Sequence, residues 1–158
     1  MKLIVIGSSL SGKTTLVSHL RQLTNVPVSE MDEELTRTNN GQFPVDNDYK
    51  HHVLAPNIIK NIISLDNIIF FTNTDYFTIE DLKSAKEKGF KILQLVLNLE
   101  ELQKRNEKRV RNENYDDQSQ WFEGMLEYQK EIRDFGLVDK VIDVNGPIEK
   151  IVQDMLSE

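Results

Sequence analysis

The sequence contains no cysteine and no long apolar run. The lack of cysteine excludes disulfide bonds and thiolate metal sites, and it fits a cytoplasmic protein. A helix that spans a membrane needs about 18 or more consecutive apolar residues, and no such stretch occurs. Residues 1–6 leave too little room for a signal peptide before a glycine-rich motif begins. We therefore expect one cytoplasmic domain over residues 1–158 that is not inserted in a membrane.

Positive charge is scarce as well, since 19 lysine and arginine residues stand against 26 acidic ones, for a net charge of -7. An acidic chain repels phosphate backbones, so we expect no nucleic-acid polymer as a partner. Five of the basic residues nevertheless fall within residues 104–111, which contain only one acid. Such a small cationic segment in an acidic chain suits a small polyanion better than DNA.

A complete phosphate-binding motif follows the first apolar run. Residues 7–14 satisfy G-x-x-x-x-G-K-[ST] at every fixed position, between an apolar segment and an amphipathic one. Glycines permit the backbone angles that turn several N–H groups toward one anion, and the helix that begins here adds its positive dipole end. We expect Lys13 to reach the β- and γ-phosphates and Thr14 to bind Mg²⁺ through its hydroxyl. The predicted nucleotide contacts are Gly7, Ser8, Ser9, Leu10, Ser11, Gly12, Lys13, Thr14 and Thr15.

Apolar runs alternate with helical patterns along the chain, which is typical of an α/β domain with a parallel sheet. The expected strands are residues 2–6, 26–29, 67–71, 92–97 and 140–144. The expected helices are residues 13–23, 52–64, 78–89, a segment after Asn98 that carries the basic residues, 117–133, and a last helix from Pro147. Residues 33–50 are polar and aperiodic, so we expect a loop there. In the helix 117–133, Trp121 and Tyr128 are expected to fill the core, with stacking on a nucleotide base as the alternative.

The sequence has no Asn-Lys-x-Asp guanine motif and no Ser-Gly-Gly-Gln transporter signature. It instead resembles the small P-loop kinases, a family that includes shikimate kinase, nicotinamide riboside kinase and nucleoside monophosphate kinases such as adenylate kinase. The segments that carry the resemblance are residues 7–15, 29–35, 68–78, 99–109 and 140–152. The resemblance implies a three-layer α/β P-loop fold, with a five-stranded parallel sheet and a short lid after the fourth strand.

Two acidic residues lie just past the second expected strand. In kinases of this family, residues at this place often meet the phosphoryl acceptor, and Glu30 and Asp32 occupy it here. A carboxylate can orient or deprotonate an acceptor hydroxyl, which is the chemistry that phosphoryl transfer leaves to a side chain. The alternative is a solvated acidic turn, because residues 32–34 are all acidic. For His51 and His52, a place in the acceptor pocket and an exposed helix start are both open.

The resemblance also implies roles for Asp75, Arg105 and Arg109. Asp75 follows the third expected strand and is our candidate for a carboxylate near Mg²⁺, with a simple turn cap as the alternative. Arg105 and Arg109 share one helix face and match the lid arginines of the family. Guanidinium is planar, always charged and bidentate toward phosphate, which suits a lid residue that holds the transferring phosphate. The alternative is a set of surface ion pairs such as Glu101–Arg105, in which the acid precedes the base by four residues. Arg109 has no acid four residues before it.

We predict an ATP-dependent kinase that uses Mg²⁺ and transfers the γ-phosphate to a small acceptor. Its predicted catalytic residues are Lys13, Asp32, Arg105 and Arg109. Among acceptors we rank a nucleoside or ribosyl compound first, a nucleoside monophosphate second and a shikimate-like polyol third. The alternative function is a nucleotide-binding regulatory or partner-binding protein without kinase activity. We expect a monomer or a homodimer.

Overall fold

The computed structural model describes residues 1–157. Its strands form one parallel five-stranded sheet in the order β2-β3-β1-β4-β5. The strands are β1 (Lys2–Ile6), β2 (Val28–Glu30), β3 (Ile68–Thr72), β4 (Lys91–Val96) and β5 (Lys140–Asp143). The helices are α1 (Lys13–Leu23), α2 (Met31–Thr38), α3 (Asn47–Tyr49), α4 (Ala55–Ile63), α5 (Ile79–Glu87), α6 (Leu99–Glu113), α7 (Phe122–Asp134) and α8 (Ile148–Leu156). The predicted α/β fold with a five-stranded parallel sheet is confirmed.

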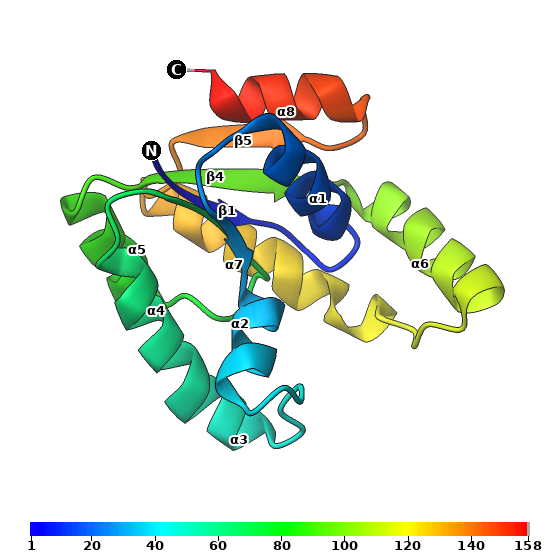
Figure 1. Ribbon diagram of the computed structural model, residues 1–158. Coiled ribbons are helices and arrows are strands. Elements are labelled where there is room, and N and C mark those ends of the chain that lie inside the picture. Colours follow the sequence, from blue (N-terminus) through cyan, green and yellow to red (C-terminus); the bar gives the residue numbers. More distant parts are fainter. Residues whose placement is uncertain (158) are drawn as a thin grey trace.

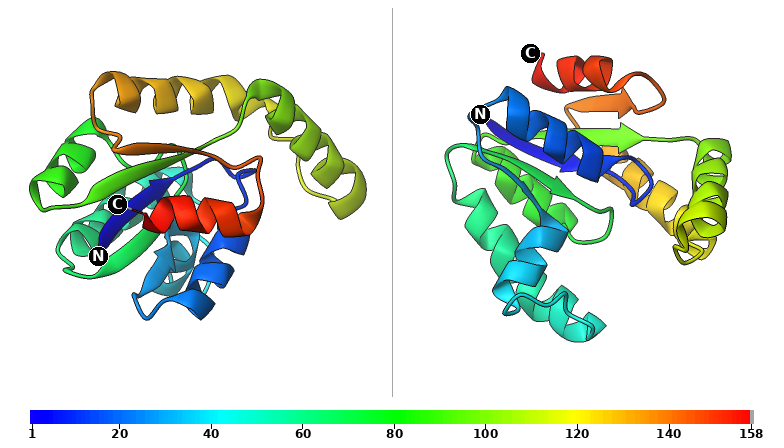
Figure 2. Two further views of the ribbon diagram at one scale, coloured as in Figure 1. Left: turned by 90° about the horizontal axis from the view of Figure 1, so that it is seen from above. Right: turned by 45° about the vertical axis from the view of Figure 1, so that its right-hand side comes forward.

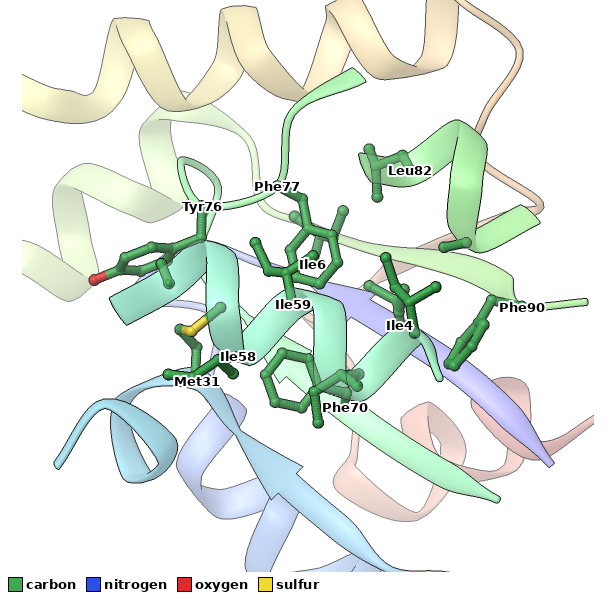
Figure 3. Packing of buried hydrophobic residues seen from close by; sticks show 14 of the residues in the cluster. Ile4, Ile6, Met31, Ile58, Ile59, Phe70, Tyr76, Phe77, Leu82 and Phe90 are labelled. Carbon is green, nitrogen blue, oxygen red and sulfur yellow. The ribbon is translucent and has the colours of Figure 1, made fainter. Parts of the chain in front are cut away.

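Helices cover both faces of the sheet, which explains why its central strands are apolar at nearly every position. Figure 1 shows α1 and α8 above the sheet and α4, α5 and α7 below it. Along β1 the side chains alternate between the two faces. Ile4 and Ile6 pack in the cluster that contains α4 and α5 (Figure 3), whereas Leu3 and Val5 pack with α1 and α8. The two halves of the core therefore lie back to back on one sheet.

The largest difference from the sequence prediction lies in residues 33–50, where a loop was expected. Helix α2 occupies Met31–Thr38, and a π-helical turn over Lys50–Leu54 joins α3 to α4. Met31 and Leu35 are four residues apart, so they lie on one helix face, and both are fully buried. Two apolar positions are too few to reveal a helical period in a sequence. The three acids that follow Met31 fall in the first helical turn, where the helix dipole favours negative charge.

Two helix starts agree with the predictions from capping residues. The Thr78 side chain accepts a hydrogen bond from Asp81 N, and Asp81 accepts one from Thr78 N, which is a complete capping box for α5. Asn98 caps α6 by accepting from Glu101 N. The expectation for Trp121 was wrong, since its side chain is 56% exposed at the end of a 3₁₀ turn before α7. Tyr128 does pack against the core, and its hydroxyl donates to Phe77 O.

Several loops that matter for function leave the sheet at the same edge. In a parallel sheet the carboxyl ends of all strands lie together, and ligands bind in the crevice beyond them. The residues at 7–12 follow β1, α2 follows β2, the segment 73–78 follows β3, and α6 follows β4. Figure 2 shows α6 beyond the end of β4, standing away from the sheet. Among the described residues, no helix is long and apolar enough to cross a membrane.

Candidate functional site

The loop between β1 and α1 has the tight backbone that its glycines allow. Gly12 precedes α1 with φ at +80°, a left-handed conformation that favours glycine. A Cβ atom on Gly7 would lie 2.6 Å from Ser11 Oγ and 3.1 Å from Leu95 Cβ, so the loop can approach β4 only without a side chain there. Ser11 closes the loop on itself, because its backbone N and its Oγ both donate to Ser8 O. The loop and the amino end of α1 thus have the tight backbone that the motif predicts for an anion cradle.

The Lys13 ammonium lies inside this loop. Its Nζ donates to Gly7 O at 2.9 Å and to Ser8 O at 2.7 Å, and the side chain is buried. Burial lowers the pKa of Lys13 to about 8, although the nearby carboxylates of Glu30 and Asp32 act in the opposite direction. A cation held only by neutral carbonyls is ready to exchange them for phosphate oxygens, which would offset the cost of its burial.

A cavity of about 740 Å³ opens beside the phosphate loop. The side chains around it come from the loop, from the end of β2 and from α6 with the segment that follows. Its walls include Ser9, Leu10, Gly12, Lys13, Thr14, Thr15, Glu30, Asp32, Asn73, Arg105, Arg109, Tyr115 and Gln118. All four predicted catalytic residues line this first cavity. The structure thus brings together residues that are more than 90 positions apart in the sequence.

Both predicted lid arginines reach the phosphate loop. Arg105 donates from Nη1 to Leu10 O at 2.9 Å and from Nη2 to Val144 O at 3.2 Å. Arg109 donates from Nη1 to Ser9 O at 3.1 Å, and its guanidinium carbon lies 4.2 Å from the centre of the Tyr115 ring. The alternative pair Glu101–Arg105 does not form, because Glu101 lies near Lys104 instead. The two arginines therefore hold α6 against the phosphate loop. Their contact with phosphate stays a prediction.

A second cavity of about 700 Å³ adjoins the first. It lies between α3 with the π-helical turn, the segment after β3, and the amino end of α7. Its walls include Phe43, Asn47, Lys50, His51, Thr74, Asp75, Tyr76, Trp121, Met125 and Tyr128. The residues that line both cavities are Ser9, Asp32, Asn73 and Gln118. The two cavities therefore meet, and a molecule in one can touch a molecule in the other.

Asp32 and Glu30 differ in their positions relative to the two cavities. Asp32, the second residue of α2, stands where the cavities meet, while Glu30 ends β2 and lines only the first. Burial raises the pKa of Asp32, and the ammonium groups of Lys13 and Lys50 oppose that rise. Burial likewise raises the pKa of Glu30, and the negative charge of Asp32 adds to it. A partly buried carboxylate with a raised pKa is a better proton acceptor than one in water.

Asp75, the carboxylate of the magnesium prediction, lines a different cavity from Thr14, and its contact with Mg²⁺ stays a prediction. It lies three residues beyond the end of β3 and lines the second cavity, whereas Thr14 lines the first. Its Oδ2 is 3.2 Å from His51 Nε2, and the imidazole stacks on the Tyr76 ring at 5.0 Å between centres. Of the charged groups that act on the pKa of Lys13, Asp75 has the smallest effect. His51 thus belongs to the second cavity, while His52 is exposed and does not line it.

Sequence reasoning missed several residues of the two cavities. Asn73 follows β3 directly, and a polar residue at the carboxyl end of a buried strand is a signal that could have found it. Lys50 and Trp121 sit on a π-helical turn and a 3₁₀ turn, for which single sequences carry no clear pattern. Tyr115 and Gln118 lie between α6 and α7, in a stretch without periodicity.

The first cavity fits a magnesium nucleotide by its chemistry. A polyphosphate needs hydrogen-bond donors and positive charge. The loop amides, the Lys13 ammonium and two guanidinium groups supply both in this cavity. The Thr14 hydroxyl and the Glu30 carboxylate provide hard oxygen ligands on the same cavity, and Mg²⁺ prefers oxygen ligands together with phosphate oxygens and water. The arrangement is suited to bind a nucleoside triphosphate next to a second, smaller molecule.

A scan against models of protein families finds no match, and a search of curated proteins finds none either. Solved structures, by contrast, resemble the chain over nearly its whole length. Shikimate kinase from Aquifex aeolicus is 20% identical, with a TM-score of 0.74 over 99% of this chain and 94% of that one. A gluconokinase from Sinorhizobium meliloti is 20% identical, with a TM-score of 0.64 over 98% and 89%. The YorR protein from Bacillus subtilis, solved with phosphorylated GDP, is 19% identical, with a TM-score of 0.65 over 98% and 94%.

At these identities the likeness concerns the fold. It agrees with the five-stranded parallel sheet and the helices on both of its faces. The chain has the fold of the small P-loop kinases.

Proposed function

We propose that the protein is a kinase that transfers the γ-phosphate of ATP to a hydroxyl group of a small molecule in the second cavity. The observation that carries this proposal is the position of Asp32, which lines both cavities where they meet. Phosphoryl transfer needs two substrates in contact and a group that orients the nucleophile. The solved structures of the same fold support a phosphotransferase, since they include a shikimate kinase and a gluconokinase.

In this proposal the residues of the first cavity bind and neutralise the triphosphate. The Lys13 ammonium leaves its two carbonyl partners and meets the β- and γ-phosphate oxygens. Arg109 holds the transferring phosphoryl group, where charge is spread over three oxygens, and Arg105 keeps α6 in place through its bonds to two loops. Magnesium, when bound, neutralises charge on the same phosphates. We propose the Thr14 hydroxyl and Glu30 as its protein ligands, since they share this cavity and Asp75 does not line it.

Asp32 acts on the acceptor. Its carboxylate accepts a hydrogen bond from the acceptor hydroxyl and takes up the proton as that oxygen bonds to the γ-phosphorus. The bond between this phosphorus and the bridging oxygen breaks at the same time, and ADP leaves with the electron pair. The raised pKa of Asp32 fits a group that must hold a proton during the transfer.

The test is a comparison of Asp32→Asn with the unaltered protein, with Mg·ATP and adenosine, uridine, AMP, shikimate and gluconate as acceptor probes. We expect at least one probe to stimulate ADP release. Asp32→Asn should lower single-turnover transfer to that probe by about 10²-fold or more, the usual contribution of a positioned general base. Its ATP affinity should change little, because the amide leaves the cradle intact.

Glu33→Gln is the matched control, because Glu33 follows Asp32 but pairs with Arg21 and lines neither cavity. This variant should transfer phosphate at the unaltered rate. Tight ATP binding with no stimulated ADP release by any probe would contradict the kinase and favour a regulatory nucleotide-binding protein. Loss of ATP affinity in Asp32→Asn would instead assign Asp32 to the magnesium site.

A further inference from the structure

Aromatic side chains from three separate segments line the second cavity. Phe43 comes from the loop between α2 and α3, Tyr76 from the segment after β3, and Trp121 from the turn before α7. Phe43 is 46% exposed and Trp121 56% exposed, although large aromatic side chains normally gain from burial. Tyr76 lies at the edge of the hydrophobic cluster (Figure 3), where burial raises the pKa of its hydroxyl. The exposed rings of Phe43 and Trp121 are suited to stack on a flat ring, whereas Tyr76 is already stacked on His51.

The charges of this cavity are the second observation. Asp32 and Asp75 contribute two carboxylates, and Lys50 is the one lysine or arginine among the described residues that line it. The Lys50 ammonium lies 5.3 Å from the centre of the Phe43 ring and 5.9 Å from that of Tyr76, so it is held over two aromatic faces. Its positive charge also opposes the rise that burial causes in the pKa of Asp32. Arginine binds carboxylate and phosphate groups bidentately, and no arginine among residues 1–157 lines this cavity.

From these observations we infer that the second cavity binds an uncharged nucleoside, that is, a flat heterocycle joined to a sugar with free hydroxyl groups. The inference rests on the proposed function, in which the γ-phosphate of ATP passes to a molecule in the second cavity. It names the chemical class of that molecule. The heterocycle stacks against Trp121 and Phe43, and a sugar hydroxyl reaches Asp32 at the junction of the cavities. A volume of about 700 Å³ is ample for a molecule of this size.

Asp75 has a specificity role in this arrangement, in place of the metal role expected from the sequence. Its carboxylate is 63% exposed on the cavity wall and partnered by His51. A sugar acid or a nucleoside monophosphate would bring a further negative charge near the carboxylates of Asp75 and Asp32, and like charges placed together across an interface oppose binding. A sugar hydroxyl can donate to the same carboxylates. The wall thus favours hydroxyl groups over anions.

The single tryptophan of the sequence makes the site directly observable. Trp121 is the only source of tryptophan fluorescence, and it lines this cavity. We would titrate the protein with adenosine, uridine, AMP, shikimate and gluconate, with and without a non-hydrolysable Mg·ATP analogue. We expect saturable quenching by adenosine or uridine, with an affinity at least about tenfold higher than that for AMP, shikimate or gluconate.

Two variants test the contributions of stacking and charge. Trp121→Ala should weaken nucleoside binding by about tenfold or more in calorimetric titrations, whereas Phe135→Ala, which removes an exposed aromatic ring outside the cavity, should leave it unchanged. Asp75→Asn should narrow the preference for adenosine over AMP by about fivefold. Asp48→Asn removes a charge from α3 without altering the cavity wall, and it should keep the full preference.

The outcomes separate this inference from the kinase proposal. Quenching by nucleosides without phosphoryl transfer to them or to any other probe would support the binding site and contradict the kinase. Transfer to AMP, shikimate or gluconate, with no binding of either nucleoside, would overturn the nucleoside site and leave the kinase standing. Failure of both nucleosides to bind, or equal preferences in Asp75→Asn and the unaltered protein, would also overturn the inference.

Discussion

At the scale of single residues, the phosphate loop holds a lysine in an environment that does not favour its charge. Lys13 is buried among backbone carbonyls, and its pKa of about 8 reflects the loss of hydration. Near pH 8, about half of the free protein therefore carries a neutral amine at this position. A bound polyphosphate would stabilise the ammonium and raise its pKa again. Nucleotide binding and protonation of Lys13 should thus be coupled.

This coupling predicts proton uptake when Mg·ATP binds near pH 8. Calorimetric titrations in buffers of different ionisation enthalpy should give a slope of up to about half a proton taken up per nucleotide. Well below pH 8 the lysine is already charged, so this contribution should disappear. Lys13→Arg keeps a permanent charge, so its binding of Mg·ATP should involve no proton uptake at this position. A buffer-independent enthalpy in the unaltered protein would mean that Lys13 does not change its protonation on binding.

Arg109 and Arg111 provide a second comparison on the same helix. Arg109 reaches Ser9 O in the phosphate loop, while Arg111 is exposed and lines neither cavity. If Arg109 stabilises charge that develops during transfer, Arg109→Ala should lower kcat and kcat/KM together by about 10²-fold, with a much smaller change in ATP affinity. Arg111→Ala should be nearly silent. Equal, small losses in steady-state kinetics of both variants would reduce the basic segment to surface charge.

The sequence was informative where a residue type, a fixed spacing and an element boundary coincide. Lys13 and Arg105 line the first cavity because the motif and the helix period fix their direction, and Asp32 was predicted from its place just past β2. Asp75 was assigned from its place after β3 and from the family resemblance, whereas its contact with His51 depends on how the π-helical turn packs against that segment. Such a contact between residues 24 positions apart leaves no pattern in one sequence.

At the scale of elements, the segment between α6 and α7 is fixed by one buried amide. Asn106 of α6 donates from Nδ2 to Asp117 Oδ1 at 2.7 Å and accepts from Gln118 N at 2.9 Å. The Ser119 N–H donates to the same Asp117 oxygen, and these hydrogen bonds lower the pKa of Asp117. Gln118 is one of the residues that both cavities share. Helix α6 therefore positions part of the wall that the two cavities share.

Asn106→Ala should loosen this wall. The variant loses two hydrogen bonds at a buried position, so we expect the free energy of unfolding to fall by about 1–3 kcal/mol. Amide hydrogen exchange of residues 116–119 should become faster, while that of the central strand β1 keeps its slow rate apart from the global loss of stability. Asn112→Ala, an exposed change on the same helix, is the control. Unaltered exchange at 116–119 would show that other contacts hold the segment.

The elements also show which parts of the fold a sequence predicts well. β1, α1 and the cap residues of α5 and α6 agree with the predictions, since long apolar periods and capping side chains are local signals. α2 was missed because only Met31 and Leu35 mark its buried face. Both side chains are buried in the cluster that contains α4. That contact is tertiary and outweighs the weak local preference.

At the scale of the whole molecule, we expect the two apolar clusters to unfold together. They lie on opposite faces of one sheet, and each central strand supplies side chains to both, as β1 does with Ile4 and Val5. Loss of either helix layer would expose the strands that hold the other. The first cavity is built on the same strands, so a nucleotide bound there stabilises the entire sheet.

This architecture predicts that the chain unfolds as one domain. In scanning calorimetry, residues 1–158 should unfold in a single transition whose calorimetric and van't Hoff enthalpies agree. Mg·ATP at about 100 times its dissociation constant should add about 2.7 kcal/mol to the free energy of unfolding. For a chain of this size that corresponds to a rise in Tm of roughly 5–11 °C, because each kcal/mol shifts Tm by about 2–4 °C. The transition should remain single. Two resolved transitions, of which Mg·ATP moves only one, would mean that the clusters on the two faces of the sheet unfold as separate units.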